Sequence, residues 1–513
     1  MTRTPPLFSV IALTSTAALW LVSGCAVGPD FKTPPAPSVK TYTENALPAQ
    51  TTATDNVAGG ASQTFAEDKD IPADWWKLFG SDPLNALMEQ ALKANPDLQA
   101  AQAALRQAQE NLYAQQGTFY PAVDLTPSIT REKISPASYG QPNAPSSLFT
   151  LYNASVSVSY GLDIFGGTRR TEEAFKAQAE SARFQREAAY LTLTANIVTA
   201  AVQEASLREQ IKATRDIIDL EHKQWDLIGK QFEYGAVAKA PLLAQEAVLA
   251  QAEATLPVLE KQLAQKRNQL AVLSGHLPGD AQIAAFDLTT LHLPEALPIS
   301  IPSKLVEQRP DIKASEALLH SASAEIGVAT ANMLPQVTLN AGYGSQATTF
   351  SNLFSAPAEV WSVGGGLLQP LFRGGTLLHD RRASVAAYDK AAAQYQSTVL
   401  GAFQNVADTL AALQYDADAL KAQEHASHAA SQSLELSRIQ LDAGAINYAQ
   451  LLITEQTYQQ SRIALAQARA ARFADTAALF QSLGGGWWNR TEPAAKDTAS
   501  LPQTLPANGD AKQ

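Results

Sequence analysis

The sequence has 513 residues, of which 46% are hydrophobic, and carries a formal net charge of -11 at pH 7. This balance argues against a general nucleic-acid-binding role, because contacts to phosphates need a basic face and the Lys and Arg residues here are scattered. The single cysteine excludes an internal disulfide and leaves no set of thiols for a zinc site.

The N-terminus has the order of an export signal. Arg3 is followed by an apolar segment from Leu7 to Val22, which is too short for a spanning helix, and small residues then lead to Cys25. We therefore expect residues 1–24 to be a lipoprotein signal peptide and Cys25 to carry the lipid, the alternative being a stray thiol. The segment resembles a lipobox, and by resemblance to Gram-negative lipoproteins the Ala26 that follows favours the outer membrane.

The two ends of the mature chain are expected to be extended. Residues 25–70 form a lipidated linker rich in Pro, Thr, Ala and Gly, and residues 491–513 form a similar, disordered tail. After the signal no apolar run reaches the roughly eighteen residues of a spanning helix. A mature protein that crosses a membrane must therefore do so with strands.

The chain contains an internal duplication. Residues 95–125 recur without a gap at residues 309–339, with prolines, aspartates and leucines aligned. Later glycines match at similar offsets, which places a first repeat at 71–280 and a second repeat at 281–490. Each repeat predicts a helix, a β-hairpin, a very long helix, a tight turn and a helix, an order in which no compact enzyme domain is built.

The longest predicted elements are two segments almost free of helix breakers. Residues 168–228 contain no Gly or Pro, and residues 376–443 contain only Gly401. If continuous, each helix is about 90 to 100 Å long. Apolar residues recur at alternating steps of three and four, as in the seam of a coiled coil. The seam positions are Ala188, Leu191, Ala195, Val198, Val202 and Ala205 in the first segment and Val385, Tyr388, Ala392, Tyr395, Val399, Ala402 and Val406 in the second.

Four shorter segments alternate apolar with polar residues. We expect strands at about 121–132 and 150–164 in the first repeat and at about 335–346 and 358–372 in the second. Such alternation also suits a soluble sheet, but these hairpins are flanked by the longest helices and follow an exported N-terminus. Four strands are too few to close a membrane barrel, so several chains must contribute strands to one barrel.

Several short motifs occur in order along the chain. They are Gly24-Cys25-Ala26-Val27-Gly28-Pro29-Asp30, Asp74-Trp75-Trp76, Asn95-Pro96-Asp97-Leu98, Asp163-Ile164-Phe165-Gly166-Gly167, Gln308-Arg309-Pro310-Asp311, Gln369-Pro370-Leu371-Phe372-Arg373-Gly374-Gly375 and Leu483-Gly484-Gly485-Gly486-Trp487. Together with the duplication, this series resembles the TolC-like outer-membrane factor family, in particular its lipidated, NodT-type branch. The resemblance covers nearly the whole mature chain.

The resemblance implies a fold that is mainly α with a membrane β-barrel. Three chains would form a homotrimer with a twelve-stranded barrel, and the duplicated helix–hairpin–helix units would continue it as a long periplasmic α-helical barrel. It also implies two partners, a periplasmic adaptor (membrane fusion protein) and an inner-membrane RND-type pump. The protein would be lipid-anchored in the cell outer membrane and extend into the periplasm. The number of chains comes only from this resemblance.

In each repeat a glycine turn joins the long helix to the helix that follows. Glycine at such a position ends a helix, whatever the function of the turn. The resemblance implies that these turns are also the periplasmic tips, where the channel closes and the adaptor docks. The residues assigned to the tips are Tyr234, Gly235, Ala236, Gly444 and Ala445.

The closed tip departs from the pattern of the family, whose well-studied members place axis-facing acids a few positions after the turn glycine. The matching positions here are not acidic, being Ala449, Gln450 and Ile453 after Gly444, and Ala240, Pro241 and Ala244 after Gly235. We hypothesise that Ile453, with Leu452 and Tyr448, forms an apolar closure that excludes water. The nearest acids are Glu455 and Glu246, and in the alternative Glu455 takes the charged role after a small rotation of the helix.

Motifs for catalysis are not found. The sequence has no metalloprotease, nucleophile-elbow, phosphate-loop or EF-hand pattern, so we expect no enzyme activity, cofactor or metal. His425 and His428 lie three apart on a helix but lack a third ligand, which favours solvated surface histidines. The tryptophan pairs at 75–76 and 487–488 are expected to pack around the helical wall instead of holding a ligand.

The leading functional hypothesis is a passive exit duct of a tripartite efflux pump, which moves small toxic molecules with energy from a partner. An alternative is the outer-membrane component of a type I protein-secretion system. A third hypothesis, from another class, is a coiled-coil envelope lipoprotein without a channel. The four strands count against the third hypothesis.

Overall fold

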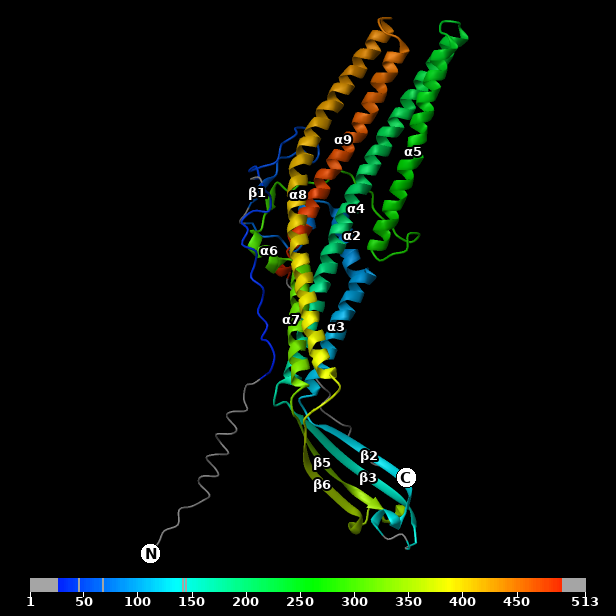
Figure 1. Cartoon of the computed structure of the whole chain (residues 1–513). Helices are drawn as coiled ribbons and strands as arrows, with labels where there is room; N and C mark the ends of the chain where they lie inside the picture. Colours follow the sequence, from blue (N-terminus) through cyan, green and yellow to red (C-terminus); the bar gives the residue numbers. More distant parts are fainter. Residues whose placement is uncertain (1–25, 45–46, 67–68, 141–142, 144, 491–513) are drawn as a thin grey trace.

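The computed structural model describes residues 26–490 apart from 45–46, 67–68, 141–142 and 144. The molecule is elongated, with long helices at one end and a four-stranded sheet at the other (Figure 1). Cys25, the expected signal peptide and the expected C-terminal tail lie outside the described residues.

The two repeats give matching main elements. The first has α3 (Pro96–Gly117), β2 (Ala122–Ile134), β3 (Ser147–Leu162), α4 (Gly167–Glu233) and α5 (Lys239–Leu273). The second has α7 (Pro310–Ala331), β5 (Gln336–Ala347), β6 (Glu359–Leu368), α8 (Thr376–Asp442) and α9 (Tyr448–Ser482). Both long helices have 67 residues and both helices after the turn have 35, so α4 and α8 are each about 100 Å long.

Shorter elements surround the middle of the helices. They are β1 (Thr64–Ala66), η1 (Trp75–Phe79), α2 (Asp82–Ala94), β4 (Ala296–Pro298), α6 (Pro302–Gln308) and η5 (Trp487–Asn489). Three further 3-10 turns lie near the loops of the sheet, namely η2 (Pro136–Tyr139), η3 (Phe350–Asn352) and η4 (Ala356–Ala358). β1 pairs in parallel with β4, which ties the N-terminal segment to the start of the second repeat.

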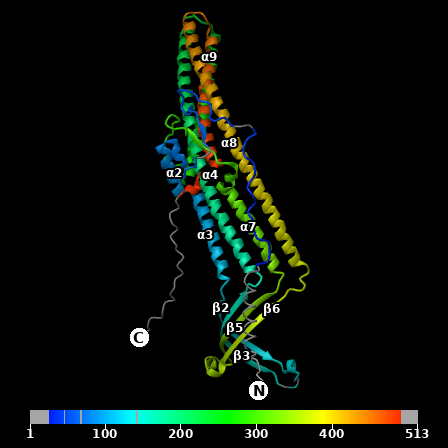
Figure 2. The same cartoon turned by 90° about the vertical axis from the view of Figure 1, so that its left-hand side faces the viewer.

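The helices pack through the predicted seams. In α4 the seam is buried from Leu191 to Ala205, and in α8 it is buried from Tyr395 to Val406, while the positions before each stretch are half-buried. The largest core side chains gather at the middle, where Trp75 stacks on Phe480 with ring centroids 5.3 Å apart. Figures 1 and 2 show α4, α7 and α8 side by side above the sheet.

The sheet has the order β2-β3-β5-β6, and all its neighbouring strands are antiparallel. Its register places Val156 beside Leu125 on one side and Tyr343 on the other, so apolar residues share one face and Ser, Thr and Asn residues share the opposite face. The outer edges of β2 and β6 have no strand beside them among the described residues.

Two strand boundaries differ from the sequence expectation. The second strand was expected from about 150 and begins at Ser147, because the ladder with β2 extends to the pair Ile134 and Ser147. The fourth was expected to run to about 372 and ends at Leu368, just before Gln369 and Pro370. Proline has no backbone N–H to donate to a ladder, which accounts for the early end. Among the described residues no helix is both long and apolar enough to span a membrane.

Candidate functional site at the helix tips and the anchor segment

The segment that follows Cys25 is fastened where the sheet meets the helices. The Val27 backbone N–H donates to the Phe165 carbonyl oxygen at 3.0 Å. Arg170, buried near the start of α4, donates from Nε to the Val27 carbonyl at 3.1 Å and from Nη2 to Asp30 Oδ1 at 2.7 Å. We call residues 26–30 the anchor segment. The anchor segment therefore lies at the level where the strands end and α4 begins.

The first tip turn contains a complete Schellman motif, in which the two backbone N–H groups beyond a helix bond back to its last carbonyls. The Gly235 N–H donates to the Phe232 carbonyl at 2.9 Å, and the Ala236 N–H donates to the Gln231 carbonyl at 2.8 Å. Gly235 has φ +72°, a left-handed conformation that costs an L-residue energy. The predicted role of this glycine as the end of the helix therefore has a direct geometric cause.

The second tip turn repeats the first. Gly444 has φ +71°, and the Ala445 N–H donates to the Gln440 carbonyl at 2.8 Å. The helices that follow differ, because α9 begins with a side-chain cap in which the Gln450 N–H donates to Asn447 Oδ1 at 3.0 Å. The two tips lie at the same end of the molecule, opposite the sheet (Figure 1).

Side chains of the predicted tip and gate set have different environments. Tyr234 is 87% exposed and Ile453 is 57% exposed, which are high values for apolar side chains. Leu452 and Tyr448 are half-buried, and the Tyr448 hydroxyl donates to Gln231 Oε1 at 3.2 Å. Tyr448 thus bridges the start of α9 to the end of α4.

Glu455 lies away from the exposed side of α9. It is 1% exposed and accepts a hydrogen bond from Gln224 Nε2 of α4 at 2.8 Å. It lies two positions after Ile453, a spacing that places the two side chains on nearly opposite faces of a helix. Burial and the negative charge of Glu221 raise the pKa of Glu455 to about 7, against the lowering effect of Arg438.

The histidine pair considered as metal ligands gains no third ligand in the described structure. His425 and His428 are both exposed on α8. Across the described ranges, no three His, Cys, Asp or Glu side chains come together as ligands for a metal ion.

Both repeats match a known family. The chain fits the family described as outer membrane efflux protein over residues 87–276 and 301–485, which together are more than half of its length. It belongs to that family. The two matched segments correspond to the two repeats, since each contains one hairpin of the sheet and one long helix.

Individual relatives span almost the whole chain. Over 425 residues it is 29% identical to the pyoverdine export outer membrane protein OpmQ of Pseudomonas aeruginosa, which covers 82% of this chain and 89% of OpmQ. Over 490 residues it is 28% identical to the toluene efflux pump outer membrane protein TtgC of Pseudomonas putida, with 95% and 97% covered. The solved structure of the outer-membrane channel OprN aligns with a TM-score of 0.80 at 28% identity, covering 90% of this chain and all of that one.

This outer membrane efflux protein is therefore an outer-membrane channel component of an efflux pump, with the fold of the TolC-like channels. The family, fold class, general function and outer-membrane location expected from the sequence are confirmed. The roles of Cys25, the tip residues and the gate residues stay predictions.

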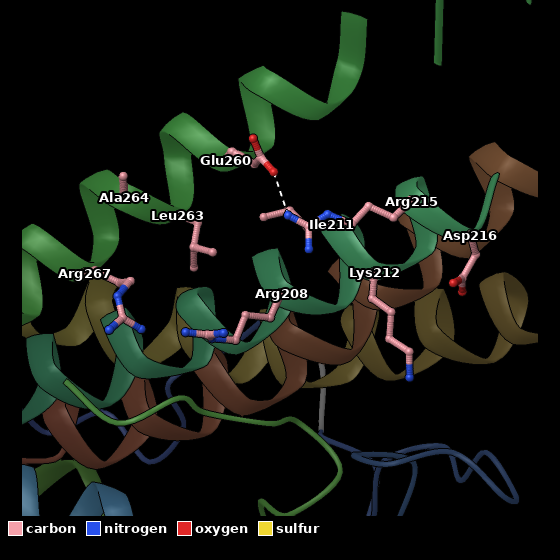
Figure 3. A pocket seen from close by; sticks show the side chains of 9 residues that line it. All are labelled: Arg208, Ile211, Lys212, Arg215, Asp216, Glu260, Leu263, Ala264 and Arg267. Atoms are coloured by element: carbon pink, nitrogen blue, oxygen red, sulfur yellow. Dashed lines mark hydrogen bonds and ion pairs between the residues drawn. The ribbon is translucent and has the colours of Figure 1, made fainter. Parts of the chain in front are cut away.

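Nearer the middle of the efflux protein, α4 and α5 enclose a cavity of about 500 Å³ with Ile211 and Leu263 among its lining residues (Figure 3). Its three arginines are paired with acids. Arg215 lies 2.7 Å from Glu260 across the cavity. Two further arginines, Arg208 and Arg267, contact the buried carboxylate of Glu204 at 2.6 and 3.3 Å. The Arg215–Glu260 and Arg267–Glu204 pairs join α4 to α5, so the cavity is part of the contact within this helical hairpin.

Sequence reasoning missed Glu221 as a partner of Glu455. A signal was present, because Glu221 follows Ile217 by four residues and precedes Ile228 by seven, and therefore occupies the same helical stripe. A carboxylate in an otherwise buried stripe indicates a polar contact between helices. Its partner on α9 could be found only from the packing of α4 against α9.

Proposed function

We propose that this protein is the exit duct of a tripartite efflux pump and that three copies assemble to form it. The observation that carries this proposal is the open sheet, in which one face is apolar and the outer edges of β2 and β6 pair with no other described strand. An open edge in lipid leaves backbone groups unsatisfied, which costs several kcal/mol per group. Pairing β6 of one copy with β2 of the next removes every edge in a closed ring.

Mass measurement of the detergent-solubilised protein tests the assembly. The expected species has three times the mass of the mature chain. A protein that remains a monomer and still inserts into bilayers would contradict the proposed architecture, because its edges would face lipid.

The cargo we propose is a small toxic molecule that crosses a water-filled duct without any bond being made or broken. The relatives OpmQ and TtgC carry names that refer to pyoverdine export and toluene efflux, which supports small molecules over the secreted proteins of a type I system. Loss of the gene should then lower the tolerated concentration of toxic compounds. Unchanged tolerance with loss of one secreted protein favours the alternative.

At the opposite end from the sheet, we propose that the exposed tip residues receive a periplasmic adaptor that connects the duct to an inner-membrane RND-type pump. The tip set consists of Tyr234, Gly235, Ala236, Gly444 and Ala445. The support is geometric, because both turns end at one level and Tyr234 exposes most of its ring. Exposed aromatic side chains are frequent anchors of protein contacts.

Closure of the duct is proposed to be apolar at Ile453, aided by Leu452 and Tyr448. Ile453 is exposed in the single chain, whereas Glu455 is engaged with α4, so the exposed side of α9 at this level presents a branched apolar side chain. A ring of three such side chains near an axis obstructs ions by excluding water. Cys25 is proposed to hold the lipid that anchors the assembly beside the anchor segment.

A further inference from the structure

Two glutamates join the hairpin α4–α5 to the hairpin α8–α9. A glutamine of each hairpin donates a hydrogen bond to the glutamate of the other. On α4, Glu221 Oε1 accepts from Gln459 Nε2 of α9 at 3.2 Å. On α9, Glu455 Oε1 accepts from Gln224 Nε2 of α4 at 2.8 Å. Each helix thus supplies one carboxylate and one amide, spaced three or four residues apart on one face. We call these four residues the reciprocal cluster.

In the reciprocal cluster the two acids are buried, whereas Gln224 and Gln459 are half-buried. Glu221 and Glu455 are both buried, and Gln245 of α5, also buried, donates from Nε2 to Glu221 Oε2 at 2.5 Å. Within the described part of the chain, Glu455 Oε2 has no hydrogen-bond partner. A buried carboxylate oxygen without a donor is costly when the group is charged, and protonation removes that cost.

The surrounding charges do not neutralise both carboxylates. Arg438 of α8 is the one cation beside them in the described structure, with Nη2 3.6 Å from Glu455 Oε1. A cavity of about 450 Å³ adjoins the pair. The other ionisable residues that line it are Asp216 on α4, Glu435 on α8, and Tyr458 and Arg462 on α9.

Among these other described ionisable groups that line the cavity, Glu435 alone changes the balance of charge. Arg462 lies 3.4 Å from Asp216, so this pair compensates itself. From α5 the cluster receives the neutral amide of Gln245, while Glu253 of α5 pairs with His222 on the exposed side of α4. One arginine therefore serves two buried carboxylates, and Glu435 adds a further negative charge at the cavity.

We propose that Glu221 and Glu455 together hold one proton near neutral pH, and that this proton fastens the α8–α9 hairpin to α4. The ligand of this site is thus a proton, which reaches it through water in the adjoining cavity. With one carboxyl neutral, Arg438 balances the other, and both reciprocal amide bonds persist. The proposal rests on the proposed function, because the proton would fasten the hairpins whose tips are proposed to close the duct.

Loss of the proton leaves two like charges in a poorly hydrated interface. The repulsion between the two carboxylates is large where the effective dielectric constant is low. The single positive charge of Arg438 compensates only one of the two negative charges. Burial raises the pKa of Glu221 as well, so both groups favour the shared proton at neutral pH. Raising the pH is therefore expected to loosen α9 from α4 toward the tip, whereas lowering it fastens the two helices.

Hydrogen exchange of the full-length protein in detergent tests the proposal. Protection factors of backbone amides in residues 439–459 are measured at about pH 5.5 and about pH 8.5, after correction for intrinsic exchange. The wild type is expected to lose about tenfold in protection at the higher pH, equal to about one unit of pKa linkage. Glu455→Gln, whose amide resembles the neutral acid, is expected to keep its protection at both pH values.

A matched control is Glu246→Gln, which removes an exposed acid of α5 near the same tip. It should behave as the wild type does. Glu221→Gln is the second variant and should also suppress the pH effect, which keeps the test valid if Glu455→Gln does not fold. A Glu455→Gln protein that loses protection as the wild type does, or a wild type whose protection is independent of pH, overturns the proposal.

Bilayer recording separates this inference from the proposed function. The wild type is expected to open more often above about pH 7, with the effect absent in Glu455→Gln. A protein that conducts at no pH contradicts the exit-duct proposal, and the exchange experiment then decides the proton site by itself. Conduction with identical pH dependence in wild type and both Gln variants contradicts the proton site alone.

Discussion

Gly327 lies so close to Arg170 that a β-carbon at Gly327 would come within 2.7 Å of the arginine Cγ and within 2.9 Å of the Val27 carbonyl oxygen. The absence of a side chain on α7 therefore allows the anchor segment and its arginine to lie flat on the helices. The backbone of Gly28 packs against the backbone of Gly327, since a β-carbon on Gly28 would overlap it.

The first prediction is that Gly327→Ala loosens the anchor segment. Overpacking of a tight site costs about 1 to 3 kcal/mol, so we expect a lower midpoint of thermal unfolding and faster proteolysis within residues 26–30. Gly401→Ala is the matched control, because Gly401 is also helical but a β-carbon there meets nothing within 4 Å. Equal effects of the two substitutions would contradict the close packing.

The second prediction concerns the turn at Gly444. Alanine in the left-handed conformation of this residue costs about 1 kcal/mol, while asparagine tolerates it better. We therefore expect Gly444→Ala to weaken efflux and Gly444→Asn to restore most of it, as measured by the tolerated concentration of a toxic compound. Because a β-carbon at Gly444 would meet no described atom within 4 Å beyond its chain neighbours, the expected cause is backbone conformation. Full activity of the alanine variant would argue that the turn geometry is dispensable.

The third prediction is that Cys25 carries the lipid. Metabolic labelling with a fatty acid should mark the wild type and leave Cys25→Ser unlabelled. Since the strands also hold the protein in the membrane, the serine variant should retain part of its efflux. Equal labelling of both proteins would refute lipidation at this residue.

The fourth prediction separates Ile453 from Glu455 at the gate. In the proposed trimer, Ile453→Asp would place three carboxylates near the axis, so it should introduce a preference for cations in single-channel recordings. Glu455→Gln should leave ion selectivity unchanged, because that carboxylate is bound to α4. If Glu455→Gln instead abolishes a cation preference and Ile453→Asp resembles the wild type, the apolar gate is wrong.

The fifth prediction uses a second buried acid. Burial and the neighbouring Asp416 raise the pKa of Asp475 to about 8, although Arg472 opposes the shift. A raised carboxyl pKa means that the folded state holds a proton that the unfolded chain has already released. The free energy of unfolding should therefore fall as the pH rises from about 4 to about 8, by up to about 5 kcal/mol.

Asp475→Asn removes this dependence and should stabilise the protein most at the upper end of that range. The exposed Asp389 of α8 provides the control, since Asp389→Asn should preserve the slope of stability against pH. Chemical denaturation at several pH values measures both variants. A wild-type slope that survives in Asp475→Asn would assign the dependence to another group.

Local sequence patterns were sufficient to predict the main helices and strands of the two repeats. The three-and-four spacing from Leu191 to Ala205 predicted the buried stripe of α4, and alternation around Val156 predicted a strand with one apolar face. Such periodicities survive folding because a helix or strand must place its apolar side chains on one face. The end of β6 was misjudged because the pattern continued to residue 372, while Pro370 prevents the ladder from continuing.

By itself the sequence determined the duplication, the long helices, the hairpins and the glycine turns, since each depends on residues that are neighbours along the chain. Only the tertiary structure decided that Glu455 turns toward α4 and meets Gln224 and Arg438, groups 231 and 17 residues away. Burial and charge at that position come from helices that are remote in sequence. From its position in the sequence, Glu455 was a candidate acid of the channel. In the structure it is part of a contact between the two hairpins, because the packing of the helices determines its neighbours.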